Sequence, residues 1–224
     1  MVKSLLFKQR IDFDINGAIY FRRIYMDKDI YLSHLEKLEN AVWTTRKNRI
    51  NAEERLLSIN RFVQHINIYY ACLSAAIAIV SLWYTDKALT MLGAILAPIV
   101  TICVIFSNSQ RYEQRAADIK RNYIKLQKIL YQVQRLELAD AIDPTQLESL
   151  ENGYCELMSE VENHHQCDYW KTVYQSGFAG KNDAPPKFEK WKYFLYRGIC
   201  CLLCVSAYVA PFLGYFVINA ILTY

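Results

Sequence analysis

The chain has 224 residues, of which 53% are hydrophobic and 21% are charged, and its formal net charge is +4 at pH 7. The mean hydropathy of +0.01 hides an uneven pattern, because the charged residues are excluded from three long apolar windows. This pattern argues against a soluble globular domain. The weakly basic composition gives no nucleic-acid signal by itself, so we expect no nucleic-acid partner.

The N-terminal segment is mixed in character. Residues 1–10 contain no apolar run long enough for a secretory signal peptide, so we expect the first membrane span to act as its own insertion signal. Residues 7–25 fit either a short amphipathic helix or two short strands.

A long helix is predicted to run from Tyr31 into the membrane, because no glycine or proline occurs between Tyr31 and Leu92. Before the membrane this helix carries an apolar seam with alternating spacings of three and four residues, the period of a coiled-coil face. Thr45 and Arg49 weaken the seam in its middle. The seam consists of Leu35, Leu38, Val42, Thr45, Arg49, Ala52, Leu56, Ile59 and Val63.

A transmembrane hairpin is predicted next. Between Gln64 and Arg111, only His65, Asp86 and Lys87 can carry charge. Each predicted span is close to the roughly 20 apolar residues that cross the hydrocarbon core of a bilayer. The two spans are Ile66–Tyr84 and Ala88–Phe106, and the turn between them is Thr85–Lys87.

Small and polar residues form one stripe on each span of the hairpin. The stripes are Asn67, Ala71, Ser74, Ala78 and Ser81 in the first span and Thr90, Ala94, Ala97, Thr101 and Asn108 in the second. Such stripes allow close packing of helices within a chain, and they also line water-filled pathways in oligomers. We favour packing within one chain, because the spans lack the ionisable residues that mark ion relays. The candidate pore-lining or span-packing residues are Asn67, Ser74, Ser81, Thr101 and Asn108.

A second long helix is predicted after the hairpin, since glycine and proline are absent from Ile99 to Ile142, and Pro98 is placed to kink the span before it. The seam of this helix is Tyr112, Ala116, Ile119, Tyr123, Leu126, Leu130 and Val133. Two helices of about 50 residues, each roughly 75 Å long, are then expected to run antiparallel as a cytoplasmic stalk. The alternative is a compact helical bundle in which each seam is only the core-facing side.

Basic residues gather on the stalk helices next to the hairpin. The candidate contacts with an anionic ligand or with lipid headgroups are Arg46, Lys47, Arg49, Arg55, Arg111 and Arg115. We interpret them as residues drawn to anionic lipid headgroups, with a phosphate-bearing ligand as the alternative. Because Lys and Arg near span ends mark the cytoplasmic side, we expect the N-terminus in the cytoplasm and the C-terminus outside.

A further helix and a third span complete the chain. Asp143 and Pro144 suit a helix start, and we predict one helix from Pro144 to Tyr174 that packs on the stalk. Its seam is Leu147, Leu150, Tyr154, Leu157 and Val161. The uncharged run Gly198–Tyr224 supplies the third span.

The predicted fold class is an all-α membrane protein, in which a transmembrane helical hairpin continues into a long antiparallel cytoplasmic stalk and a third transmembrane helix follows at the C-terminus. We divide the chain into the N-terminal segment with the first stalk helix (1–64), the hairpin (65–109), the second stalk helix with its packing helix (110–176), a linker (177–192) and the third transmembrane helix (193–224).

Enzymatic and metal chemistry find little support in the sequence. It has no glycine-rich phosphate loop, no HExxH motif and no Gly-x-Ser-x-Gly elbow. Cys201 and Cys204 lie inside the third span, where packing explains them better than redox or zinc chemistry. His164 and His165 point about 100° apart on a helix, which favours a polar helix face over a metal site. We expect no enzymatic activity, no cofactor and no bound metal.

Several features together resemble a known family. They are the basic segment WTTRKNRINAEERL from Trp43 to Leu56, the tight two-span hairpin, and the pairs Arg111–Tyr112 and Asn122–Tyr123 in the helix that follows. In this order of parts the chain is similar to the bacterial SLATT family, two-transmembrane effector domains associated with SMODS nucleotidyltransferases and SLOG sensors. The resemblance covers about Ser33 to Tyr174, and the third span departs from the two-span pattern.

The resemblance implies an oligomeric membrane effector of bacterial anti-phage defence that permeabilises the inner membrane in response to a nucleotide second messenger. Its expected partners are the lipid bilayer, further copies of the same chain and a cyclic nucleotide or other nucleotide messenger. The alternative is a non-conducting membrane scaffold or sensor that recruits a cytoplasmic partner through its stalk. A small transporter subunit is disfavoured, because the spans carry no intramembrane charge.

Overall fold

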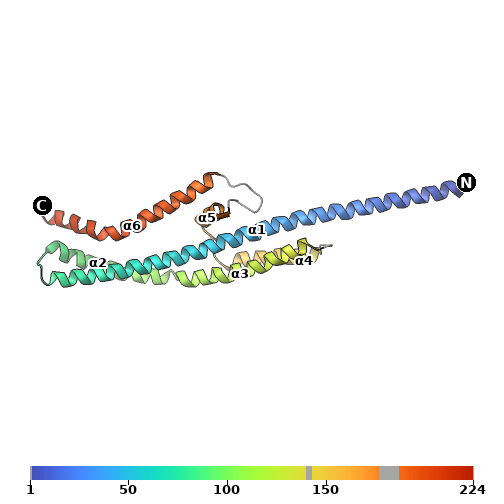
Figure 1. The fold of residues 1–224 in the computed structure, drawn as a ribbon. Coiled ribbons are helices and arrows are strands. Elements are labelled where there is room, and N and C mark those ends of the chain that lie inside the picture. Colours follow the sequence, from blue (N-terminus) through green and yellow to red (C-terminus); the bar gives the residue numbers. More distant parts are fainter. Residues whose placement is uncertain (1, 140–142, 177–186, 224) are drawn as a thin grey trace. The chain divides into compact units, whose positions relative to one another are not determined.

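The computed structural model describes residues 2–139, 143–176 and 187–223, and every regular element in these ranges is a helix (Figure 1). The helices are α1 (Val2–Ser81), α2 (Lys87–Ser109), α3 (Tyr112–Glu137), α4 (Pro144–Glu160), α5 (Gln166–Ser176) and α6 (Lys187–Thr223). The predicted all-α fold class is confirmed. The chain divides into unit 1, residues 1–46 and 124–161, and unit 2, residues 47–123 and 162–224, so α1 and α3 each contribute to both.

Helix α1 is longer at its N-terminus than the sequence pattern indicated. Residues 7–25 lie inside this single helix, so the alternative of two short strands was wrong. At its other end α1 stops at Ser81, before the predicted end of the first span at Tyr84. Asp86 explains where α2 begins, because its carboxylate accepts hydrogen bonds from the backbone N–H groups of Ala88 and Leu89 as an N-cap.

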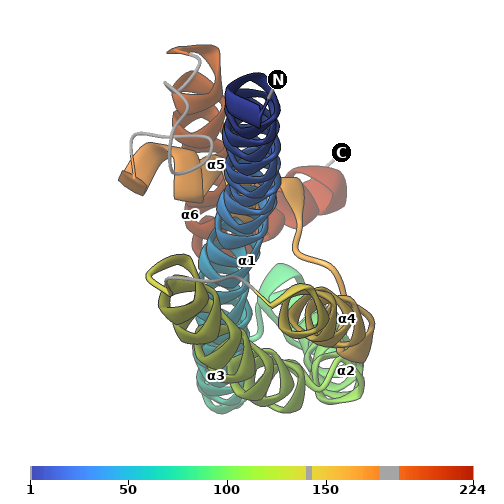
Figure 2. The same ribbon diagram turned by 90° about the vertical axis from the view of Figure 1, so that its right-hand side faces the viewer.

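Unit 1 is built on an apolar core. Fully buried side chains of α1 meet those of α3, and α4 packs alongside α3 (Figure 2) and closes the core with Leu147. The buried residues are Leu35, Leu38 and Val42 of α1, Leu126, Ile129, Leu130, Val133 and Leu136 of α3, and Leu147 of α4. The predicted seams are thus confirmed in unit 1. Two hydrogen bonds flank the core. One joins the hydroxyls of Thr45 and Tyr154 at 2.9 Å, and in the other Gln134 Nε2 donates to Glu39 Oε1 at 2.8 Å.

The second predicted rod is not continuous. It is interrupted at Gln110 and Arg111, and the backbone of Arg111 adopts a left-handed conformation with φ of 48°. The two backbone N–H groups that follow α2 donate to carbonyls three residues earlier, Gln110 to Ser107 and Arg111 to Asn108. A left-handed residue after such a turn is a common helix end, although glycine is the residue that usually occupies it. Without a glycine or proline here, periodicity alone gave no sign of the break.

The predicted helix from Pro144 to Tyr174 is also interrupted, because α4 ends at Glu160 and α5 begins at Gln166. Its predicted start is confirmed, since the Asp143 carboxylate accepts the N–H of Thr145 at 3.0 Å. The new start at α5 has a physical cause. The Asp168 carboxylate reaches back to accept the backbone N–H of His165 at 2.9 Å, as the acidic residue of a capping box does.

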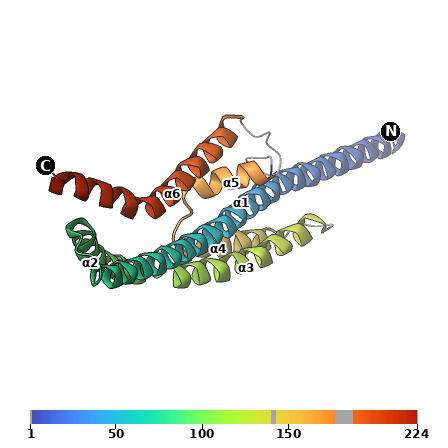
Figure 3. The ribbon, with the colours of Figure 1, turned by 60° about the vertical axis from the view of Figure 1, so that its left-hand side comes forward.

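Unit 2 contains the apolar helices. Stretches of α1, α2 and α6 are long and apolar enough to cross a membrane, which agrees with the three predicted spans. Buried Ile77, Leu92 and Leu96 form a small core with half-buried neighbours, among them Tyr215 and Ile218 of α6. Both α2 and α5 pack against α6. Helix α6 is visibly bent (Figure 3), and it carries Pro211 in its interior.

Candidate functional site

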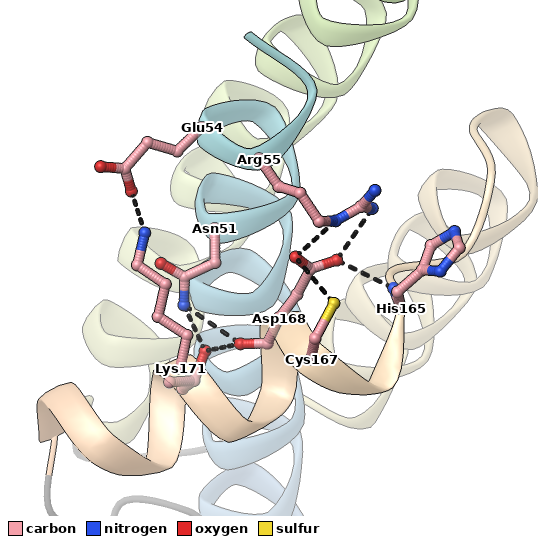
Figure 4. A network of polar contacts seen from close by, with 8 residues as sticks. Asn51, Glu54, Arg55, His165, Cys167, Asp168 and Lys171 are labelled. Atoms are coloured by element: carbon pink, nitrogen blue, oxygen red, sulfur yellow. Dashed lines mark hydrogen bonds and ion pairs between the residues drawn. The ribbon is translucent and has the colours of Figure 1, made fainter. Parts of the chain in front are cut away.

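A buried polar cluster in unit 2 joins α1 to α3, to α5 and to the turn that precedes α5. Figure 4 shows the part of it between α1 and α5, where Asn51 and Arg55 meet Asp168. We call it the polar cluster. Its members are Asn48, Arg49, Asn51 and Arg55 of α1, Asn122 of α3, His164 of the turn, and Asp168 and Thr172 of α5. Arg49 and Asn122 are each only 1% exposed, so the cluster is part of the interior of unit 2.

The strongest contact of the polar cluster is the ion pair between Arg55 and Asp168. The guanidinium binds the carboxylate with two hydrogen bonds, Nε to Oδ1 at 2.9 Å and an Nη to Oδ2 at 3.1 Å. This fork geometry is the most favourable one for arginine and carboxylate. Burial lowers the pKa of Arg55, but the hydrogen bond and charge of Asp168 outweigh burial and raise it overall, so Arg55 stays charged.

Amide and hydroxyl groups extend the cluster along α5. Asn51 Nδ2 donates to Thr172 Oγ1 at 2.8 Å and lies 3.2 Å from the Asp168 carbonyl oxygen. At the exposed edge, Lys171 forms an ion pair with Glu54. These contacts fix α5 against α1 at successive helical turns, so α5 has one preferred position along α1.

The other end of the cluster contains Arg49 and His164. Arg49 Nη1 donates to Asn122 Oδ1 of α3. Asn48 Nδ2 lies 3.0 Å from His164 Nε2. Burial lowers the pKa of His164, Asp168 opposes this, and the nearby charges of Arg49 and His165 lower it further. His164 is therefore held more strongly in its neutral form than an exposed histidine.

The face of α5 turned to α6 is aromatic. Tyr174 stacks on Tyr193 with ring centroids 4.8 Å apart, and Trp170 meets Tyr196 edge-on at 6.4 Å. The ammonium of Lys192 lies 5.9 Å from the centre of the Trp170 ring. Burial and then the charge of Asp168 raise the pKa of the neighbouring Cys167 thiol, which keeps this thiol protonated. Helix α5 thus connects the polar cluster on α1 with the first turns of α6.

The six predicted cationic residues lie in different surroundings. Arg49 is buried and Arg55 is paired with Asp168, so both are engaged inside the protein and not placed to meet a lipid headgroup. Arg115 forms an ion pair of 2.8 Å with Glu162 on the surface. Arg46 and Lys47 are half-buried, and Arg111 is exposed.

The five predicted residues of the spans are also divided. In α1, Asn67, Ser74 and Ser81 are half-buried, and the Ser81 hydroxyl donates to the carbonyl of Ile77. In α2, Thr101 and Asn108 are exposed. The whole α2 stripe shares this exposure, whereas the buried residues of α2 are Ala88, Leu92 and Leu96. Packing inside one chain therefore does not account for the α2 stripe.

Sequence reasoning did not identify the polar cluster as a unit. Thr45 and Arg49 are polar interruptions of the predicted α1 seam, and a polar residue at a seam position was the available signal for a buried contact. Asn122 gave none, because it lies next to the predicted seam position Tyr123 and not in the seam; in the structure Asn122 is buried and Tyr123 only half-buried. The partner of Arg55 gave no such signal, because Asp168 lies 113 residues away in sequence.

Comparison with protein families matches most of the chain. The model for SMODS and SLOG-associating 2TM effector domain family 5 matches residues 32–223. The matched region includes α6, which lies beyond the part of the chain that the sequence resemblance covered. Neither curated proteins nor solved structures gave a match.

Proposed function

We propose that this chain, which belongs to the SMODS and SLOG-associating 2TM effector family 5, is an oligomeric effector that permeabilises the bacterial inner membrane during anti-phage defence. A nucleotide second messenger is the proposed signal, because the family is associated with SMODS and SLOG signalling systems. The proposed activity is not enzymatic. It consists of opening the membrane once several copies have assembled.

The observation that carries this proposal is the exposed stripe on α2. Thr101 and Asn108 lie on the outside of the chain together with Thr90, Ala94 and Ala97, the other residues of the stripe. The Thr101 hydroxyl is satisfied within the helix, since it donates to the Ala97 carbonyl at 3.1 Å. The exposed Asn108 amide is unfavourable when it faces lipid, whereas facing another helix or water satisfies it. Three apolar helices are too few to enclose a water-filled pathway. The stripe is therefore suited to meet further copies of the chain and, in the open assembly, water.

The proposed orientation places the N-terminus in the cytoplasm and the C-terminus outside. The basic residues Arg46, Lys47, Arg111 and Arg115 support it, since they flank the spans on one side and would meet anionic headgroups there. The contacts of α6 support it as well. Asp86, in the turn after α1, accepts a hydrogen bond from Tyr215 near the end of α6, so α1 and α6 run toward the same side.

The proposal predicts that bulk on the α2 stripe abolishes permeabilisation. Thr101→Leu replaces a polar residue with a larger apolar one, so leakage of a trapped dye from liposomes should fall to the level of protein-free vesicles. Leakage is measured with purified protein and a panel of cyclic nucleotides as candidate signals. The matched control is Ile102→Leu, because Ile102 is also exposed on α2 but lies outside the stripe.

The control should retain the leakage of the wild type. If Thr101→Leu and Ile102→Leu leak equally, the stripe has no role in permeation. If wild-type protein never raises leakage with any nucleotide, and its overexpression leaves the membrane potential of cells intact, the effector proposal itself is wrong.

A further inference from the structure

Helix α6 contains a backbone carbonyl that its own helix cannot satisfy. Pro211 lies in the interior of α6 and is buried. Proline has no backbone N–H, so the carbonyl four residues earlier, that of Ala207, loses its helical hydrogen bond. In the hydrocarbon core of a membrane no water is present to replace it, and each unsatisfied backbone group is costly.

Tyr70 of α1 supplies the missing donor. Its hydroxyl donates to the carbonyl oxygen of Ala207 at 2.6 Å. We propose that the α1–α2 hairpin forms a docking surface, called the seat below, for a membrane helix that is kinked by proline. Helix α6 occupies this seat. Tyr70 selects a kinked helix by donating the hydrogen bond that Pro211 cannot donate. The proposal goes beyond the proposed function, since it holds whether or not the membrane is permeabilised.

A second polar contact fixes the position of α6 near the turn that joins α1 and α2. Tyr215 OH donates to the Asp86 carboxylate at 2.9 Å, in the turn that joins α1 and α2. Between these two hydrogen bonds lies the small core of Ile77, Leu92 and Leu96. A Cβ atom at Gly93 would come within 2.9 Å of Ile77 Cγ2, so this glycine allows α1 and α2 to approach closely beneath α6.

Polar contacts decide the position of α6 because apolar contacts discriminate little in lipid. Apolar side chains of α6 meet lipid tails as favourably as they meet another helix, so association depends on close packing and hydrogen bonds. Most large apolar residues of α6 between Leu202 and Leu222 are in fact exposed. A straight helix without proline would have no free carbonyl for Tyr70. The seat thus favours a kinked helix over a straight one.

The neighbouring residue Tyr69 provides a matched control within the same helix. Its hydroxyl donates to the carbonyl of Tyr208 at 3.1 Å. Phe212, four residues later, carries a backbone N–H that is available as the helical donor to this carbonyl. Loss of the Tyr69 hydroxyl therefore leaves no carbonyl without a donor, whereas loss of the Tyr70 hydroxyl does.

The test is a double-mutant cycle on the full chain in detergent micelles, read as the apparent Tm. With Pro211 present, Tyr70→Phe should lower the Tm by about 2–4 °C more than Tyr69→Phe, the shift that one lost net hydrogen bond causes in a chain of this size. In the Pro211→Ala background the N–H is restored, so the two substitutions should give equal shifts. Pro211→Leu restores the same N–H and serves as a second background.

Two results would overturn the proposal. Equal shifts for Tyr70→Phe and Tyr69→Phe with Pro211 present would mean that the Ala207 carbonyl does not need Tyr70. An excess shift for Tyr70→Phe that persists unchanged in both Pro211 backgrounds would mean that Tyr70 acts through some contact unrelated to the proline. Because the readout is stability and not leakage, failure here is distinguishable from failure of the effector proposal.

Discussion

Unit 1 and unit 2 share the helices α1 and α3, yet different chemistry holds each unit together. The seam of α1 is apolar in unit 1, where Leu35 and Val42 are fully buried. In unit 2 the same seam, with the same spacing, buries Arg49 beside Ala52 and Leu56. The period of the seam therefore determines which positions are buried, while the residues at those positions determine whether packing or hydrogen bonding holds the helices.

This difference has a consequence for specificity. An apolar core accepts residues of similar volume with little loss of stability. A buried, hydrogen-bonded ion pair accepts almost no substitution, because removal of one partner leaves the other charge without compensation. We infer that unit 2 holds α5 in one position, whereas the apolar core of unit 1 only needs its volume filled. Substitutions at Asp168, Leu126 and His164, with their controls, examine this contrast.

The largest effect is expected for Asp168→Ala. This change leaves Arg55 without its carboxylate and removes the cap of α5, and it should lower the free energy of unfolding by about 4 kcal/mol, of which about 1 kcal/mol is the lost cap. Asp168→Asn, which keeps the volume, should lose most of the same stability. The measurement is denaturant unfolding in micelles, combined with limited proteolysis around α5.

The matched control for Asp168→Ala is Glu162→Ala, which breaks the ion pair with Arg115. The side chains of that pair are 33% and 40% exposed, so solvent screens the charges and the loss should be about 0.5 kcal/mol or less. If Glu162→Ala costs as much as Asp168→Ala, burial of the polar cluster does not determine the stability of unit 2.

The sequence predicted the seams well because burial on a long helix follows local spacing. Leu126 and Val133 were identified as core residues from their spacing alone, and both are fully buried. The two helix breaks were missed for a different reason. Arg111 and His165 are not helix breakers, and the breaks beside them depend on a left-handed backbone and on a cap from Asp168, respectively.

The candidate site was predicted only in part. The cationic residues of α1 were recognised from their number, but a count of charges does not show which are paired. The hairpin, α3 and α4 lie between Arg55 and its partner Asp168 in the sequence. Contacts of this kind depend on the fold, so the sequence indicated an anion-binding surface where the structure has an internal ion pair.

A smaller effect is expected in unit 1 for Leu126→Ala. Leu126 is completely buried, so the cavity should lower the free energy of unfolding by about 3 kcal/mol. Leu126→Met should cost less than about 1.5 kcal/mol, because the volume is kept. The losses in the free energy of unfolding for Leu126→Met and for Asp168→Asn are compared by the same denaturant unfolding measurement. If Leu126→Met loses as much stability as Leu126→Ala, the apolar core of unit 1 tolerates substitution as poorly as the polar cluster of unit 2.

The smallest effect is expected from the pH dependence of His164. Its pKa is lowered in the folded protein by burial, with Asp168 opposing and Arg49 and His165 adding to the decrease. The unfolded chain therefore binds a proton near pH 6.5 that the folded chain does not, and by linkage stability falls as the pH drops below this value. Above it both states are neutral, and the contribution of His164 is constant.

The measurement for His164 is the apparent Tm of the wild type and of His164→Asn between pH 8 and pH 5. The variant keeps a polar side chain next to Asn48 but cannot titrate, so its Tm should fall less steeply than that of the wild type below pH 6.5. Arg49 and His165 remain in both proteins, which makes the difference specific to the His164 ring. If the Tm falls equally with pH in both proteins, the prediction is wrong. The polar cluster would then stabilise the charged imidazole of His164 as well as water does. In that case the cluster would be less restrictive than the apolar core of unit 1, the reverse of what its buried ion pair implies.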